Sequence, residues 1–363
     1  MYIFLILLLL IVLVSSIIYY YYKLINRVLL VFKKKINNKL IIFLSIIFTL
    51  LSINMFSITG LFFIHFIMIS LGIDLLFLIF RKYIKNNKIV NIYKLCVFPL
   101  IITIIVMLYG FINIRNIIET KYTIYTDKDI NSDIRILLLT DSHYGDIFNK
   151  SGLDSLKYRL DSVDADIVIL GGDIVDESTS KNEMEYVFKV FGSIKNTMGI
   201  YYVYGNHDEQ QYNINRSYSF DELNNAILSN NINILSDSYK VLDNNVVIVG
   251  RKDYSQGRDF ISNYLKNISL DNYLIMLDHQ PVKYLENIDF GIDLILSGHT
   301  HGGQIFGLHW LAQRLNNGFV KGLYKIGDMQ LYINRGTSLW FGFPIRLGIE
   351  PEITLITLKR TPQ

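Results

Sequence analysis

The sequence predicts an all-α membrane module followed by an α/β domain. Apolar runs long enough to approach the thickness of a bilayer fill the first third of the 363-residue chain. Beyond about residue 122, short apolar runs typical of buried strands alternate with stretches of helical periodicity. Polar clusters rich in histidine and aspartate follow five of these strand-like runs. The first part is therefore expected to face lipid, and the second to carry the functional site.

The membrane module is predicted to occupy residues 1–118 and to contain four helical spans. A helix needs roughly 20 apolar residues to cross a hydrocarbon core of about 30 Å, and the last run is at the short end of that range. A buried hairpin in a soluble domain is the alternative for the second and third runs, but nothing else in the chain could cover so much apolar surface. The predicted spans lie near residues 2–22, 40–59, 61–80 and 97–113.

Basic residues predict how this module is oriented. They gather between the first and second spans and between the third and fourth, which places both loops in the cytoplasm and the α/β domain outside. The segment 24–32 is a candidate for an interfacial helix. Asp74 lies within the third span, where it could face serine or asparagine partners. The basic residues are Lys23, Arg27, Lys33, Lys34, Lys35 and Lys39 in the first loop, and Arg81, Lys82, Lys85, Lys88 and Lys94 in the second.

The second part is predicted to contain parallel strands joined by crossover helices, because strand-like and helical stretches alternate. Since the carboxyl ends of such strands line one crevice, we expect the polar clusters that follow them to converge. The strand-like runs are 134–139, 167–170, 200–204, 273–277 and 292–296, and the helical stretches are 182–195 and 220–230. The clusters are residues 140–143, 171–176, 205–208, 278–281 and 297–304.

The residue types in these clusters indicate a metal site. Residues i and i+2 of an extended segment point to the same side, so Asp141 with His143, and His299 with His301, are expected to face one pocket. The separation of roughly 6–7 Å between such positions suits two neighbouring metals better than one. Mixed aspartate, histidine and asparagine ligation favours Mn, Fe or Zn, whereas an all-oxygen site would suit Mg or Ca.

The order of the clusters resembles the calcineurin-like metallophosphoesterase superfamily over about residues 122–360. The motifs read D-x-H, G-D-x-x-D, G-N-H-D, H and G-H-T-H, and five in this order are a specific signal, whereas any one alone is weak. The form G-H-T-H-G-G-Q, with the later Arg335-Gly336 and Pro344-Ile345-Arg346, is most similar to a bacterial membrane-associated branch. Some members of that branch act on UDP-2,3-diacylglucosamine in lipid A synthesis. The resemblance implies a β-sandwich flanked by helices.

The same resemblance implies two divalent metal ions joined by the carboxylate of Asp173, which thereby takes part in catalysis. A water or hydroxide between the metals would attack phosphorus. One metal would be held by Asp141, His143 and His301, and the other by Asn206, His279 and His299.

Further roles are implied beside the metals. His207 would protonate the leaving oxygen or stabilise the charge developing there. Asp176 and Asp208 are candidates for carboxylates that orient imidazoles. Arg335 and Arg346 could meet phosphate oxygens, with structural ion pairs as the alternative.

Composition narrows the function further. The net charge of +3 is small, and much of the basic surplus lies in the two loops. This argues against a nucleic-acid-binding surface on the α/β domain. The single cysteine, Cys96, excludes an internal disulfide and a thiolate metal cluster. We therefore expect a metal-dependent phosphoric ester hydrolase, anchored in the lipid bilayer, that cleaves a phosphodiester, pyrophosphate or phosphomonoester in a lipid-linked or envelope substrate.

Two alternatives stay open. The first is a UDP-2,3-diacylglucosamine-type pyrophosphatase, although that substrate is normally cleaved on the cytoplasmic side. The second, from another class, is a metal-binding membrane sensor without catalytic turnover, for which degenerate ligands would be the signature.

Overall fold

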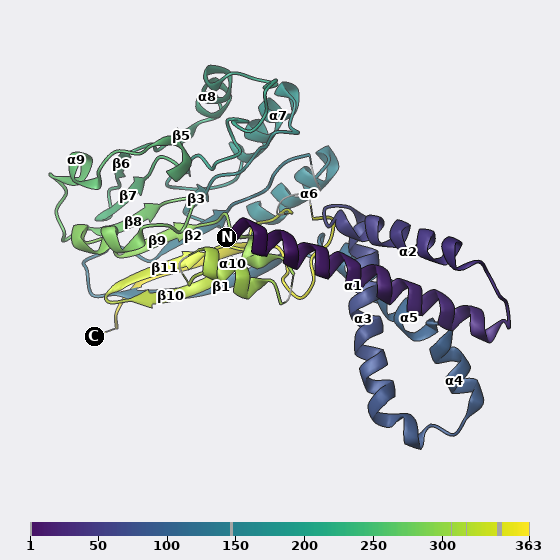
Figure 1. Ribbon diagram of the computed structural model, residues 1–363. Coiled ribbons are helices and arrows are strands. Elements are labelled where there is room, and N and C mark those ends of the chain that lie inside the picture. Colours follow the sequence, from purple (N-terminus) through teal and green to yellow (C-terminus); the bar gives the residue numbers. More distant parts are fainter. Residues whose placement is uncertain (1, 146–147, 306, 317, 340–342, 363) are drawn as a thin grey trace. The chain divides into compact units, whose positions relative to one another are not determined.

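The computed structural model describes residues 2–145, 148–305, 307–316, 318–339 and 343–362 (Figure 1). The chain divides into two compact units. The first, which we call the helical unit, contains Met1–Phe111 with Phe343–Ile345. The second, the α/β unit, contains Ile112–Gly342 with Arg346–Gln363.

The helical unit is built from apolar helices with polar caps. The side chains of Asn37, Ser57 and Asn86 accept hydrogen bonds from backbone amides at the starts of the second, third and fourth helices. Such caps satisfy amide groups that the helix itself leaves unpaired. The elements are α1 (Tyr2–Val31), α2 (Asn38–Ile53), α3 (Ile58–Phe80), the 3-10 turn η1 (Arg81–Tyr83), α4 (Asn87–Lys94) and α5 (Val97–Asn113).

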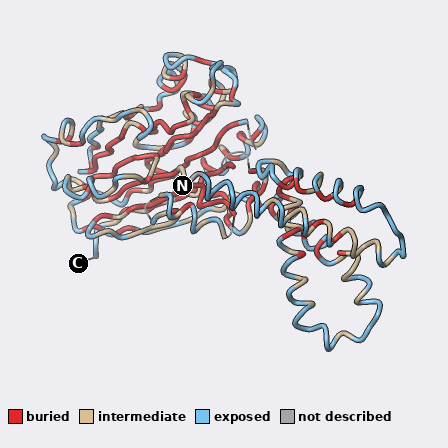
Figure 2. Tube along the Cα trace, viewed as in Figure 1, coloured by how far each residue is buried: buried red, intermediate tan, exposed pale blue. Residues whose placement is uncertain are grey.

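Two helical segments, Phe4–Val31 and Ile58–Tyr83, are long and apolar enough to cross a membrane. In the most apolar 18-residue stretch of each segment only 6% and 11% of the residues are buried, and Figure 2 shows these helices as largely exposed. Helices α4 and α5 meet at 55° and form a third span only if the bent pair crosses as one. At 1.5 Å per residue α2 is only about 24 Å long. The prediction of four spans therefore stays a prediction.

An ion pair joins helices α1 and α3 of the helical unit. Helix α1 continues to Val31, so residues 24–31 extend the first helix instead of forming a separate interfacial one. Arg27 therefore lies in α1 rather than in a loop, and its Nη1 is 2.5 Å from Asp74 Oδ1 in α3. The Tyr20 hydroxyl donates to the other oxygen of Asp74 at 2.9 Å. The expectation of serine or asparagine partners for Asp74 was wrong, because an arginine neutralises its charge and a tyrosine donates a hydrogen bond to it.

The α/β unit is a sandwich of two six-stranded sheets. The first sheet has the order β1 (Ile118–Thr126), β12 (Glu352–Arg360), β2 (Ile134–Leu139), β3 (Ile167–Leu170), β4 (Ile200–Tyr202) and β5 (Ile232–Ile234). The second has the order β10 (Gly322–Ile326), β11 (Met329–Ile333), β9 (Leu294–Ser297), β8 (Tyr273–Leu277), β7 (Val246–Gly250) and β6 (Ser238–Val241). Strands β2 to β5 are parallel, as are β7, β8 and β9. The predicted α/β class and sandwich are confirmed.

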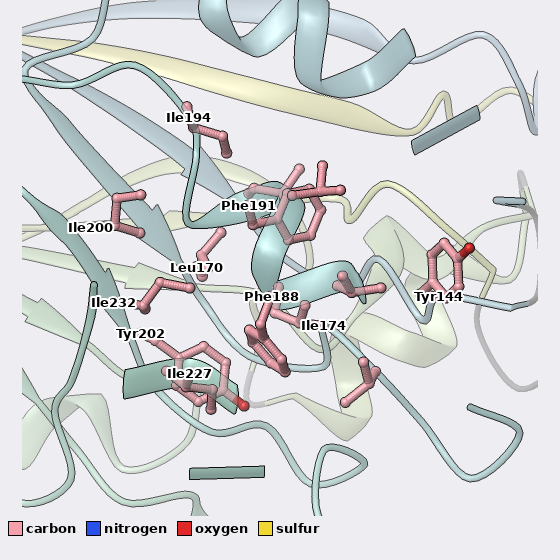
Figure 3. Packing of buried hydrophobic residues seen from close by; sticks show 14 of the residues in the cluster. Tyr144, Leu170, Ile174, Phe188, Phe191, Ile194, Ile200, Tyr202, Ile227 and Ile232 are labelled. Carbon is pink, nitrogen blue, oxygen red and sulfur yellow. The ribbon is translucent and has the colours of Figure 1, made fainter. Parts of the chain in front are cut away.

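Both faces of the central strands are buried, which explains their uninterrupted apolar sequences. In β2, Ile136 and Leu138 face the opposite sheet, whereas Leu137 and Leu139 face the helices outside it. Those helices are α6 (Lys150–Asp161), α7 (Lys181–Phe191) and α8 (Phe220–Leu228). Figure 3 shows side chains of α7 and α8 packed over this face of the sheet.

Smaller elements complete the α/β unit. A third apolar cluster covers the outer face of the second sheet and includes side chains of α9 (Ile261–Leu265). The remaining elements are α10 (His309–Leu315) and the 3-10 turns η2 (Tyr254–Gln256), η3 (Tyr284–Phe290) and η4 (His301–Gly303). The loops that follow β2, β3, β4, β8 and β9 are thus carried by two rigid sheets.

Candidate metal centre

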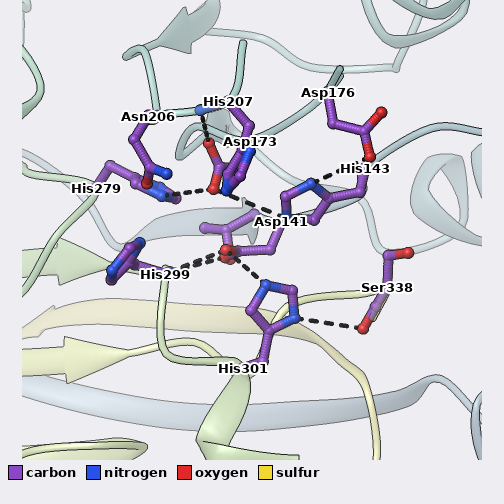
Figure 4. A network of polar contacts seen from close by, with 12 residues as sticks. Asp141, His143, Asp173, Asp176, Asn206, His207, His279, His299, His301 and Ser338 are labelled. Atoms are coloured by element: carbon purple, nitrogen blue, oxygen red, sulfur yellow. Dashed lines mark hydrogen bonds and ion pairs between the residues drawn. The ribbon is translucent and has the colours of Figure 1, made fainter. Parts of the chain in front are cut away.

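The five polar clusters lie on loops at the carboxyl ends of β2, β3, β4, β8 and β9, and they converge (Figure 4). Three of these strands are neighbours in the first sheet and two are neighbours in the second. Parallel pairing places their carboxyl ends on the same side, as the sequence predicted. The site is therefore assembled from both halves of the sandwich.

Two groups of side chains could each hold a metal ion. Within each group the ligand atoms lie within 4.8 Å of one another. Asp173 Oδ2 is 3.0 Å from His279 Nε2 in its own group and 3.7 Å from His143 Nε2 in the other. Asp173 thus stands between the groups, where a bridging carboxylate would stand. The groups are Asp141, His143 and His301, and Asp173, His279 and His299.

Two buried polar atoms at the site, one in the second group and one beside it, lack the hydrogen-bond partners that such atoms normally have. His279 Nε2 approaches Asp173 Oδ2 without forming a hydrogen bond, and Asn206 Oδ1 has no hydrogen-bond partner among the described residues. Leaving such atoms unsatisfied costs about 1–3 kcal/mol each, a penalty that a bound cation removes. The nitrogen and oxygen donors suit borderline divalent metals. The residues present therefore fit a pair of metal ions.

The histidines differ in their affinity for protons. Burial lowers the pKa of His299 and of His301 to about 4, so both imidazoles are neutral at physiological pH and able to bind a metal. Burial also acts to lower the pKa of His143, but the carboxylates of Asp176 and Asp173 outweigh it and raise that pKa to about 9. A metal ion at His143 would have to displace a proton.

Hydrogen bonds to backbone carbonyls set the direction of two imidazoles. His279 Nδ1 lies 2.9 Å from the Gly171 oxygen, which leaves Nε2 directed at Asp173. His301 Nδ1 lies 3.4 Å from the Ser338 oxygen, and its Nε2 is 3.3 Å from an Asp141 oxygen. Contacts of this kind fix the orientation of a ligating imidazole.

The two carboxylates predicted to orient imidazoles behave differently. Asp176 Oδ2 is 3.6 Å from His143 Nδ1, which suits that role. Asp208 instead accepts hydrogen bonds from the backbone, and burial raises its pKa to about 6. Its role is to hold the loop that carries Asp173, so the expectation of an imidazole partner was wrong. The amides that donate to it are those of Asp173 (2.8 Å), Ile174 (2.8 Å), Val175 (3.1 Å) and Gly205 (2.7 Å).

The two arginines are engaged within the protein. Arg335 pairs with Glu352 at 2.7 Å and with Glu350 at 3.3 Å, which is the structural alternative to phosphate binding. Arg346 is fully buried, donates to the backbone oxygens of Arg335 and Ser338, and has Nη2 3.3 Å from His301 Nδ1. The Arg335 guanidinium is thus held by two carboxylates. Nη1 of Arg346 is buried and has no hydrogen-bond partner among the described residues, so the predicted contact of Arg346 with phosphate oxygens stays a prediction.

The backbone conformation at the site differs from the extended segments predicted from the sequence. The predicted ligands of the first and last clusters are not in extended segments, so the alternation of side chains does not bring them together. Left-handed residues do so instead, each at a cost of about 1–3 kcal/mol that functional sites often carry. Their φ angles are 51° at Asp141, 36° at His143, 52° at Asp173, 69° at His299 and 47° at His301.

Two glycines let the backbone approach the carboxylates. A Cβ atom at Gly205 would lie 2.1 Å from Asp173 Oδ1, and one at Gly298 would lie 2.3 Å from Asp141 Oδ2. Neither distance is sterically allowed for a side chain. These positions require glycine because the loops from different strands pass close to the central carboxylates.

His207 lies beside the two groups and remains accessible. Its backbone amide donates to Asp173 Oδ1 at 2.8 Å, and its side chain is 23% exposed. Its Nδ1 is 2.7 Å from Glu177 Oε2. Glu177 is not among the residues predicted from the sequence, although its position directly after Asp176, in a loop that carries site residues, was an available signal.

We predict that Gly205→Ala lowers the metal content of the purified protein while leaving it folded. The added methyl group must displace Asp173, whose carboxylate contacts both ligand groups. Elemental analysis against protein concentration measures the effect, with circular dichroism as the test of folding. Gly152→Ala in α6, where a Cβ would meet only ordinary contacts, is the matched control. Normal metal content in Gly205→Ala would contradict the central placement of Asp173.

Sequence comparisons relate this chain to known proteins. Residues 134–303 match the sequence profile of the calcineurin-like phosphoesterase family. A metallophosphoesterase of Helicobacter pylori is 34% identical over 244 residues, which cover 65% of this chain and 62% of the relative, so the chain spans less than two thirds of that protein. A metallophosphoesterase of Campylobacter jejuni is 30% identical over 300 residues, covering 80% of this chain and 77% of the relative.

Similarity extends to a protein described as a membrane protein and, more loosely, to a solved structure. A transmembrane protein with metallophosphoesterase domain from Bos taurus is 29% identical over 245 residues, covering 64% of this chain and 54% of the relative. The structure of TT1561 from Thermus thermophilus covers 56% of this chain and 90% of its own, with a TM-score of 0.39 and 15% identity. On the sequence matches, this chain belongs to the calcineurin-like metallophosphoesterase family, whose members hydrolyse phosphoesters.

Proposed function

We propose that this protein is a membrane-anchored dimetal phosphoesterase that hydrolyses a phosphodiester, pyrophosphate or phosphomonoester in a lipid-linked or envelope substrate. The observation that carries the proposal is the position of Asp173 between two groups of buried ligand atoms. Two divalent ions held there, which we propose to be Mn, Fe or Zn, would activate water and neutralise phosphate oxygens.

The side chains divide the work at the site. The carboxylate of Asp173 joins the two sets of ligands, and Asn206 Oδ1 adds an oxygen donor to one of them. His207 is the accessible imidazole beside the centre, so it is placed to donate a proton to the leaving oxygen. The remaining proposed ligands are Asp141, His143 and His301 for one ion, and His279 and His299 for the other.

Several observations favour turnover over a sensor role. All the proposed ligand positions hold residues able to bind a metal, and Figure 4 shows these residues gathered around Asp141 and Asp173. The partly exposed His207 adds a proton donor that metal binding alone does not require. Apolar helices in the same chain support a substrate in or near a membrane. The net charge of +3 gives no support to a nucleic-acid substrate.

We predict that the full-length protein, purified in detergent and loaded with Mn²⁺ or Zn²⁺, hydrolyses bis(p-nitrophenyl) phosphate or p-nitrophenyl phosphate. Asp173→Asn should lower kcat by more than about 100-fold, because it removes the charge shared by both ions. Release of p-nitrophenolate reports the rate. Asp243→Asn, at an exposed position, is the matched control. A folded, metal-loaded protein that hydrolyses neither ester would favour the sensor.

We also propose that the α/β unit lies outside the cytoplasm. The loop after α1 keeps Lys33, Lys34 and Lys35, and the segment after α3 carries Arg81 and Lys82. The positive-inside rule places both loops in the cytoplasm, which requires α2 and α3 to cross the membrane as a pair. An outward site counts against cytoplasmic cleavage of UDP-2,3-diacylglucosamine, which is the alternative substrate.

Labelling of single cysteines tests this orientation. In a Cys96→Ser background, an impermeant maleimide added to intact cells should label Tyr158→Cys, an exposed position in α6. It should label Lys85→Cys, in the second basic loop, only after the membrane is permeabilised. The reverse pattern would place the site in the cytoplasm and favour the alternative substrate.

A further inference from the structure

We propose that Glu177 is the positioning residue for His207, and that the pair acts together when the leaving oxygen is protonated. This inference rests on the proposed function. Glu177 Oε2 is 2.7 Å from His207 Nδ1, and the two side chains are 26% and 23% exposed. The carboxylate accepts the Nδ1 proton and so leaves Nε2, on the far side of the ring, free for the substrate.

The neighbouring carboxylate is committed elsewhere. Asp176 Oδ1 accepts hydrogen bonds from the amide of Ser178 at 2.8 Å and from its hydroxyl at 2.7 Å. The other oxygen, Oδ2, lies 3.6 Å from Nδ1 of His143. Adjacent carboxylates in one loop thus serve different imidazoles: Asp176 supports a proposed metal ligand, and Glu177 supports the proposed proton donor.

The imidazole of His207 is constrained from several directions. Its ring centroid is 5.3 Å from that of His143, at an interplanar angle of 72°. It is 5.2 Å from the ring of Tyr212, at an angle of 55°. The backbone amide of His207 is held by Asp173. The contact with Glu177 favours one of the two orientations that are related by a flip of the imidazole ring, namely the one with Nδ1 facing the carboxylate.

The backbone of Glu177 is also tied to the loop that carries His207. The side-chain amide of Asn213 donates to the Glu177 carbonyl oxygen at 3.3 Å. The side-chain amide of Gln210 donates to the carbonyl oxygens of Asp176 at 2.8 Å and Thr179 at 2.7 Å. Because the loops after β3 and β4 are joined on both sides of Glu177, its carboxylate is held at a defined distance from the imidazole. Such placement matters because proton transfer requires alignment.

The experiment compares p-nitrophenyl phosphate with phenyl phosphate, two esters that differ only in the leaving group. The p-nitrophenolate group departs readily as an anion, whereas phenolate is more basic and gains more from a proton. In the full-length, metal-loaded protein, Glu177→Gln should lower kcat for the phenyl ester by about 10- to 100-fold. The p-nitrophenyl ester should be nearly unaffected, and metal content should be unchanged. Glu185→Gln, exposed on α7, is the matched control.

A double variant tests whether Glu177 acts through the imidazole. Adding Glu177→Gln to His207→Ala should cause no further loss on the phenyl ester, because the two residues form one unit. Equal losses on both esters, additive losses in the double variant, or loss of metal in Glu177→Gln would overturn the assignment. If the unaltered protein hydrolyses neither ester, the proposed function itself fails, a result distinct from a failure of Glu177.

Discussion

The constraint on which the α/β unit depends is the burial of negative charge at Asp141 and Asp173. A buried carboxylate is costly unless it is paired and hydrogen-bonded, and here the partners are imidazoles, backbone amides and, on our proposal, metal ions. Several other features follow from this need. Gly205 and Gly298 admit the carboxylates, and the amides gathered by Asp208 fix the turn that presents Asp173. Two rigid sheets hold these loops against one another.

Much of this arrangement could be predicted from the sequence, because strands buried on both faces leave a clear apolar signal. Strands β2, β3 and β8 have the predicted bounds, and the convergence of the loops after them follows from parallel pairing. Other strands lack such a signal. Strand β1 alternates between partly exposed and exposed residues over much of its length and pairs with β12, from the opposite end of the α/β unit. No local pattern reveals a partner so distant in the chain.

Backbone conformation and side-chain partners at the site could not be predicted from the sequence. The types of ligand residue were predicted correctly. The left-handed backbone that brings them together was not, because one sequence does not reveal the φ angles of individual residues. Asp176 and Glu177 are adjacent acids whose different partners depend on side-chain direction. Arg27 and Asp74 illustrate the same limit in the helical unit. Arg27 was assigned to a basic loop and Asp74 to serine or asparagine partners, whereas the ion pair that they form joins residues 47 positions apart.

The proposed function depends on a carboxylate that joins two metal ions, and anomalous X-ray diffraction from crystals of the metal-loaded protein would locate those ions. We expect two anomalous peaks about 3.5–4 Å apart, with the Asp173 carboxylate in contact with both. A single peak, or two peaks of which Asp173 contacts only one, would contradict it.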